Sequence, residues 1–231
     1  MHDKHGQRRA KNASKPSLII FHNENGDRRT YEGGYKALRN YFNVIAFDYR
    51  SYGDSSVAEM NETGLVKDSI SLYKWLLNNN RADIFVMGDK LGASIATHVV
   101  SKLKDKDIYP TGVILLNPFP SLSEEIREWV WPLGKIMGWM PWYNYMIKEP
   151  LQQNDLAFDT IKYIMQVDVP IMIIKSYRST LAYDVALAAS NRNDSEGMLY
   201  VRESWWSLRD DYGDDVNLAD FIDDCINFKK N

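Results

Sequence analysis

The chain has 231 residues, of which 45% are hydrophobic, and its formal net charge is −3 at pH 7. This length suits one large domain with a substantial core, and the charge gives no indication of nucleic-acid binding. Its single cysteine, Cys225, excludes an internal disulfide bond.

The N-terminal segment, residues 1–15, contains five basic residues and no apolar run. It is not typical of a signal peptide, so we expect a flexible basic tail, with contact to anionic lipid as the alternative. No stretch reaches the roughly 18 consecutive apolar residues that a membrane span requires. These features favour an intracellular location, cytoplasmic or at a membrane surface, without fixing it.

Short apolar segments alternate with helical patterns through residues 16–231. The predicted strands are Ser17–His22, Asn43–Asp48, Ile84–Gly88, Val113–Asn117, Ile171–Lys175 and Met198–Val201. The predicted helices are Thr63–Leu77, Ala93–Leu103, Leu181–Ala189 and Leu218–Phe228. Continuous apolar strands are typical of sheets covered on both faces. We therefore predict a single α/β domain whose mostly parallel sheet is flanked by helices. In the first helix, the predicted buried face carries Leu65, Ile70, Tyr73 and Leu77.

Residues 121–150, between the fourth and fifth predicted strands, interrupt this alternation. They contain four of the seven tryptophans, broken up by glycine and proline: Trp129, Trp131, Trp139 and Trp142. We predict that this segment is a small Trp-rich helical cap inserted into the domain. The tryptophans would pack between the cap and the sheet. Alternatively, they would form an apolar lid over a pocket for an acyl chain, or a surface that touches a membrane.

Three motifs follow successive predicted strands. They are His22-Asn23-Glu24-Asn25, Phe47-Asp48-Tyr49-Arg50-Ser51-Tyr52-Gly53-Asp54-Ser55 and Gly88-Asp89-Lys90-Leu91-Gly92. In order and spacing the chain resembles the α/β-hydrolase-domain lipases that cleave monoacylglycerols and lysophospholipids, notably the lysophosphatidylserine lipases. The resemblance covers about residues 17–228 and implies an α/β-hydrolase fold. It also implies an N-terminally shortened domain, without that family's membrane anchor and earliest edge strands.

The resemblance implies three catalytic positions, none of which holds the family's residue. The nucleophile of a Gly-x-Ser-x-Gly turn is replaced by Lys90, which is protonated at pH 7 and has no lone pair. The acid position falls at Ser179, and the family's histidine would fall near Arg209. No histidine follows His98, which we expect to be a packing or surface residue.

The oxyanion loop is altered as well. Asn23 stands where the family has glycine, and asparagine tolerates unusual dihedrals better than most residues. The backbone amides of Asn23 and Leu91 would be the oxyanion donors, and His22 would have a structural role. We expect Ser94, one turn past the elbow, to hydrogen-bond the helix backbone.

The leading hypothesis is a catalytically inactive pseudoenzyme that binds an apolar or anionic lipid-like ligand near His22, Asn23, Lys90 and Leu91. A lysine at a helix N-terminus would attract an anion. Alternatively, Lys90 only fills the former active site by pairing with an acidic neighbour, for which the candidates are Asp89, Glu24 and Asp54.

Two further hypotheses remain. The cap and a sheet edge could bind a protein partner, because an exposed edge strand invites pairing. The chain could also be an active serine hydrolase of the lysophospholipid or monoacylglycerol lipase type, with a non-standard site at Ser55 or Ser94. Nothing in the sequence indicates a cofactor, a metal ion or nucleic acid as a ligand.

Overall fold

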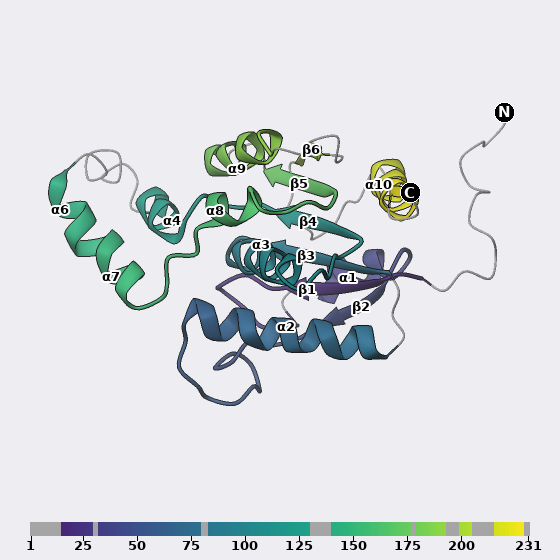
Figure 1. Cartoon of the computed structure of the whole chain (residues 1–231), viewed down its shortest axis with the longest axis horizontal. Helices are drawn as coiled ribbons and strands as arrows, with labels where there is room; N and C mark the ends of the chain where they lie inside the picture. The colour runs from purple at the N-terminus through teal and green to yellow at the C-terminus, as the bar shows by residue number, and fades with distance from the viewer. Residues whose placement is uncertain are drawn as a thin grey trace.

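The structure is a computed structural model that describes residues 15–29, 32–79, 83–129, 140–176, 179–192, 199–204 and 215–228. Its centre is one six-stranded sheet (Figure 1). The strands are β1 (Ser17–Phe21), β2 (Asn43–Ala46), β3 (Ile84–Asp89), β4 (Gly112–Leu116), β5 (Ile171–Ser176) and β6 (Leu199–Ser204). Their order is β2-β1-β3-β4-β5-β6, and every described pair is parallel. The predicted α/β fold with a parallel sheet is confirmed.

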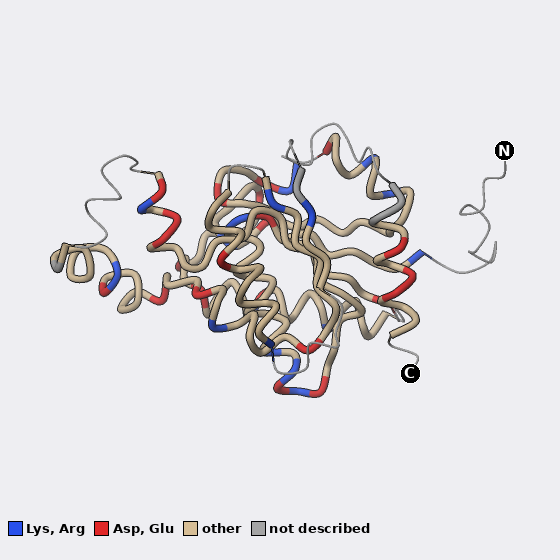
Figure 2. The backbone as a smooth tube through the Cα atoms, turned by 90° about the horizontal axis from the view of Figure 1, so that it is seen from above, with Lys and Arg blue, Asp and Glu red and all other residues tan. Residues whose placement is uncertain are grey.

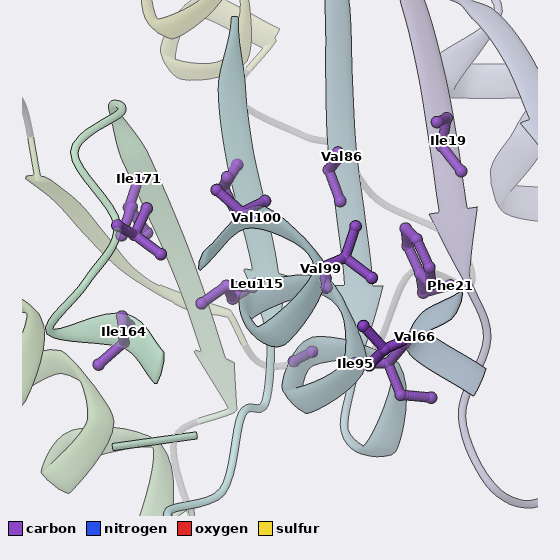
Figure 3. Close-up of a cluster of buried hydrophobic side chains, with 14 of the residues drawn as sticks. Ile19, Phe21, Val66, Val86, Ile95, Val99, Val100, Leu115, Ile164 and Ile171 are labelled. Atoms are coloured by element: carbon purple, nitrogen blue, oxygen red, sulfur yellow. The ribbon is translucent and has the colours of Figure 1, made fainter. Parts of the chain in front are cut away.

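Helices cover both faces of the sheet, which explains why its central strands are continuously apolar. One face packs against α2 (Glu62–Asn78), α3 (Leu91–Lys104), α8 (Thr160–Ile164) and α9 (Thr180–Ser190). The other face packs against α1 (Glu32–Leu38) and α10 (Asp215–Phe228). Figure 3 shows part of the first of these layers, in which Ile95 and Val99 of α3 belong to the same buried cluster as Val86 of β3. Figure 2 shows the charged residues on helices and loops around a nearly uncharged sheet interior.

The buried face of α2 differs from the prediction at two positions, Leu77 and Ile70. Leu77 is 40% exposed, whereas Leu76 is 3% exposed and Tyr73 is buried. A helix turns about 100° per residue, so Leu76 lies within about 20° of Leu65 around the axis, whereas Leu77 lies about 120° away. Ile70, also predicted on this face, is only partly buried for the same reason.

Beyond the carboxyl ends of the strands lie α4 (Leu122–Trp129), α6 (Pro141–Tyr143), the π-helix η1 (Asn144–Lys148) and α7 (Glu149–Gln153). In Figure 1 these helices stand to the left of the sheet. They occupy the segment predicted as a cap, whose limits of 121–150 stay a prediction.

The expected packing of the cap tryptophans against the sheet is wrong for the two that the structure describes. Trp129 is 57% exposed and Trp142 is 43% exposed. Tyr143 is the buried aromatic residue of α6, and its hydroxyl donates to the carbonyl of Ser123. Trp131 and Trp139 lie outside the described residues, as does most of the predicted basic tail. Within the described parts of the chain, none of the helices has the length and hydropathy that crossing a membrane requires.

Candidate functional site

Lys90 occupies a sharp turn between β3 and α3. Its backbone has a φ of 49° and a ψ of −107°, a left-handed conformation that non-glycine residues rarely adopt. The two flanking glycines are required by close backbone contacts. A Cβ atom on Gly92 would lie 2.1 Å from the carbonyl oxygen of Phe21, and one on Gly88 would lie 2.2 Å from the carbonyl oxygen of Gly92. The strained elbow geometry is therefore present, with an ammonium group at its corner.

The Lys90 side chain pairs with the cap. Its Nζ donates to Oε1 of Glu125 on α4 over 3.0 Å, and Trp129 Nε1 donates to the same oxygen over 3.0 Å. The expected partners were Asp89, Glu24 and Asp54, so the expectation of an ion pair is confirmed but its partner was wrong. The pairing depends on how α4 folds back over the elbow, which no local sequence pattern reveals.

The electrostatics of this pair keep Lys90 charged. Burial alone lowers the pKa of Lys90, but the hydrogen bond and charge of Glu125, with smaller contributions from Glu24 and Asp89, outweigh it. The pKa therefore lies above its ordinary value of 10.5. A lysine in this state carries no lone pair at neutral pH and is not a nucleophile.

A pocket of about 420 Å³ opens beside this pair. It lies at the carboxyl ends of β3, β4 and β5, the edge at which open α/β sheets bind their ligands. Its lining residues come from the elbow, the residue after β4, helix α4 of the cap, the end of β5 and the start of α9: Lys90, Asn117, Glu125, Glu128, Trp129, Ser176, Ser179, Thr180 and Leu181. Sequence reasoning placed Lys90 and Ser179 at one site and missed the others. Arg209, expected at the histidine position, lies outside the described residues.

On the β5 side of the pocket, the polar side chains accept hydrogen bonds from backbone amides. Ser179 caps α9, because its Oγ accepts from the amide of Ala182 over 3.3 Å. Asn117 follows β4 with a φ of 42°, and its Oδ1 accepts from the amide of Ser176 over 2.6 Å. Neither residue is an acid, so the position expected to orient a histidine instead serves to shape the pocket wall.

The loop after β1 supports the elbow from the other side. His22 is buried, its Nδ1 lies 2.8 Å from the carbonyl oxygen of Asn23, and its ring lies 4.0 Å from that of Tyr49. Burial lowers the pKa of His22. Asn23 Nδ2 donates to Asp89 over 3.1 Å, which joins the loop to the end of β3. These contacts match the structural role expected of His22, and neither it, Asn23 nor Leu91 lines the pocket.

The Phe47–Ser55 motif braces the same loop. The Asp48 carboxylate accepts from the Arg28 amide over 2.6 Å and from its guanidinium. Gly53 has a φ of 53°, and a Cβ there would lie 2.3 Å from Asp48 Oδ2. The hydroxyl of Ser55, a candidate nucleophile, donates to the carbonyl of Asp48 over 2.9 Å. This hydrogen bond holds the turn of the motif together.

The polar side chains of α3 make tertiary contacts. Ser94 is fully buried and shares a hydrogen bond with the Thr160 hydroxyl of α8, so the expected bond to its own helix backbone is wrong. The packing of α8 against α3 supplies this partner. His98 is buried, as expected of a packing residue, with Nδ1 2.6 Å from Glu62 Oε1 and its ring stacked on Tyr163 at 3.7 Å.

A parallel sheet in which a glycine-flanked elbow joins a strand to a helix is typical of α/β hydrolases, and here the elbow joins β3 to α3. Residues 42–191 match the profile of a family described as "alpha/beta hydrolase fold". The chain belongs to this family, which confirms the superfamily predicted from the motifs.

The relatives with assigned names include lysophosphatidylserine lipases. The chain is 26% identical over 197 residues to "Lysophosphatidylserine lipase ABHD12" of Danio rerio, covering 78% of this chain and 50% of the relative. Against the Xenopus tropicalis protein of the same name it is 28% identical over 172 residues, covering 70% of this chain and 42% of the relative. The chain thus spans about half the length of these relatives or less.

Solved structures agree on the fold. MenH from S. aureus superimposes with a TM-score of 0.64 at 14% identity, covering 93% of this chain and 96% of its own. A Pyrococcus furiosus esterase superimposes with a TM-score of 0.61 at 19% identity, covering 95% of this chain and 83% of its own. Identities this low support the architecture alone.

Proposed function

We propose that this α/β-hydrolase family member is a pseudoenzyme that binds a lysophospholipid-like ligand in the pocket beside Lys90 and does not hydrolyse it. The observation that carries the proposal is the protonated Lys90 at the elbow, ion-paired to Glu125 of the cap. Ester hydrolysis requires an activated nucleophile at that corner. The sequence has no histidine after His98, and it has Ser179 where the family resemblance implies the acid. Losing a triad as a unit costs on the order of 10⁶ in turnover.

The lining of the pocket supports an amphiphile with charged groups of both signs. Trp129 and Leu181 supply apolar wall, while Glu125, Glu128 and Lys90 supply two carboxylates and one ammonium. A simple anion would compete with Glu125 for the ammonium. In a head group that has both an amine and acidic groups, the amine can bind Glu128 and an acidic group can bind Lys90. The relatives are named for lysophosphatidylserine, whose head group has this combination.

Calorimetry with short-chain lysophosphatidylserine below its micelle concentration tests the ligand. We expect saturable binding to the wild type, weakened about tenfold by Lys90→Ala through loss of a charge-assisted hydrogen bond. Lys36→Ala, which removes an exposed lysine of α1, is the matched control and should bind as the wild type does. Absence of binding to the wild type would remove the ligand from the proposal.

A fluorophosphonate probe tests the absence of hydrolysis. We expect no labelled serine, since Ser94 is fully buried against Thr160 and the Ser55 hydroxyl is bonded to Asp48. Release of fatty acid from lysophosphatidylserine should equal the rate without protein. A labelled serine together with fatty-acid release would support the alternative, an active serine hydrolase with a non-standard site.

The exposed surface of the cap supports a second role, in peripheral membrane contact. Trp142, Tyr145 and Met146 are all at least 43% exposed on adjacent turns. Tryptophan and tyrosine favour the interface between lipid and water. In a vesicle flotation assay, the wild type should be recovered in the vesicle fraction, and less of the Trp142→Ala/Tyr145→Ala variant should be recovered there. Equal recovery of both proteins would contradict contact through this surface.

A further inference from the structure

A second pocket, of about 420 Å³, lies between α2 and α3 and shares no lining residue with the Lys90 pocket. Four lysines line it, two from each side: Lys67, Lys74, Lys102 and Lys106. We name it the α2–α3 groove. None of its lining residues belongs to the three motifs that carry the family resemblance, and the proposed function does not use it.

The lysines of the α2–α3 groove have few counter-charges. Within the described part of the chain, one of the four lysines forms an ion pair: Lys102 Nζ lies 3.3 Å from Asp105 Oδ2, and both side chains are largely exposed. In contrast, Lys104, which does not line the groove, pairs with Asp168 over 2.5 Å. Like charges gathered in one concavity repel each other and raise the local concentration of anions. This arrangement therefore favours an anionic occupant.

The wall of the groove also contains a fixed imidazole. His98 is 8% exposed, and its ring is held between the Glu62 carboxylate at Nδ1 and the stacked ring of Tyr163. The other oxygen of Glu62 accepts from the amide of Phe158 over 2.7 Å, which fixes the carboxylate in turn. Among the described residues, Nε2 has no hydrogen-bond partner. His98 thus presents a rigid, buried polar group at the groove wall.

The remaining lining defines the chemical class of the ligand. Val66 is buried and Ile70 partly buried at the groove, while Thr63 and Ser71 supply hydroxyl groups. Apolar surface beside several cations suits a molecule with a short carbon skeleton and a multivalent anionic group. A phosphate monoester carries about −1.5 to −2 charges and three acceptor oxygens, so one group can meet lysines from both helices.

We propose that the α2–α3 groove binds a small organic phosphate, with the phosphate among the four lysines and the carbon skeleton against Val66 and Ile70. The source of the phosphate is either a soluble ester or the head group of a membrane lipid, and the two are separated by experiment. The groove is large enough for a molecule of a few carbon atoms without moving either helix.

Titration with n-butyl phosphate, followed by calorimetry and by the NMR signals of the His98 ring, tests this proposal. We expect saturable shifts of the ring signals and tighter binding than for inorganic phosphate, because the butyl chain buries apolar surface. Binding should weaken as ionic strength rises. The double variant Lys67→Ala/Lys102→Ala, which removes one lysine from each helix, should bind at least about tenfold more weakly.

The matched control is Lys36→Ala/Lys104→Ala, which has the same net charge and leaves the groove lining intact. It should bind n-butyl phosphate as the wild type does, and so should Lys90→Ala, which separates this site from the proposed function. Thermal unfolding verifies that each variant is folded. Equal weakening in both double variants, or His98 signals that do not move, would overturn the proposal. Vesicles that contain phosphatidic acid separate the two sources. Vesicle binding that Lys67→Ala/Lys102→Ala abolishes supports a lipid head group, and binding to n-butyl phosphate alone supports a soluble ester. Binding to neither probe would also overturn the proposal.

Discussion

The ion pair between Lys90 and Glu125 ties the elbow to the cap, and its contribution to stability is open to measurement. At 3.0 Å and an effective dielectric constant of about 20, the Coulomb attraction is about 5.5 kcal/mol. Desolvation and side-chain ordering offset most of it, since the Lys90 side chain is 36% exposed and that of Glu125 10%. We expect a net coupling of about 1–2 kcal/mol, between the values for exposed and buried pairs.

A double-mutant cycle measures this coupling. Lys90→Met leaves a nearly buried carboxylate whose one remaining side-chain donor, among the residues that the structure describes, is the Trp129 indole, so it should destabilise the fold by about 2 kcal/mol. Glu125→Gln leaves an ammonium that reaches water and should cost only about 1 kcal/mol. The double variant should lose about 1.5 kcal/mol of stability, which is less than the sum of the two single losses. Each single variant loses the ion pair, and the double variant loses it only once.

Urea unfolding at several pH values is the assay. The raised pKa of Lys90 means that its contribution is complete below the ordinary value of 10.5 and is lost only as the pH rises through the folded-state pKa. The difference between wild type and Lys90→Met should therefore be constant from about pH 7 to 9. Additive single effects, or a larger loss for Glu125→Gln than for Lys90→Met, would refute the ion pair as a link between cap and elbow.

Three further predictions concern the elbow and its helix. Lys90→Ser should not raise p-nitrophenyl butyrate hydrolysis above the wild-type level, because His98 is bound to Glu62 and the pocket has no described histidine; a hundredfold increase would contradict this. Gly92→Ala should destabilise the fold by about 3 kcal/mol in urea, since its Cβ would meet the carbonyl oxygen at the end of β1 at 2.1 Å. Glu62→Ala should cost about 3 kcal/mol and accelerate hydrogen exchange at the Phe158 amide, because it leaves two buried donors unpaired; unchanged exchange would count against this role.

The sheet was predictable from the sequence because its strands are short, continuous apolar runs. β1 and β4 are buried along their whole length, and Ser17 at the start of β1 is their only polar side chain, so the apolar run stays visible. The helices that were missed lack such a pattern. Helix α1 contains Gly33 and Gly34, which disfavour a helix, and α8 has five residues and is held by a cap in which Asp159 accepts from the amide of Lys162. Such elements depend on tertiary packing.

The candidate site was predictable only where strand ends determine it. Lys90 follows β3 and Ser179 follows β5, and only β4 separates these two strands. Both residues therefore lie at the same carboxyl edge of the sheet, so their proximity could be inferred from topology. The pairing with Glu125 spans 35 residues and depends on the angle at which α4 leaves β4. The partner of Ser94 likewise comes from α8, 66 residues away. Hydrogen bonds between distant elements leave no periodic signal in the chain.

The elbow itself carries less functional information than its resemblance suggests. Gly92 is required because α3 begins against the end of β1, and Gly88 because the turn closes on Gly92. Both contacts are between backbone atoms, so they would be needed whatever side chain stood at the corner. A lysine there accepts a left-handed φ that costs roughly 1–2 kcal/mol. The fold can therefore keep this turn for packing alone, so the presence of the elbow indicates the fold and not the reaction. Its chemistry follows from Lys90 and the groups that contact it.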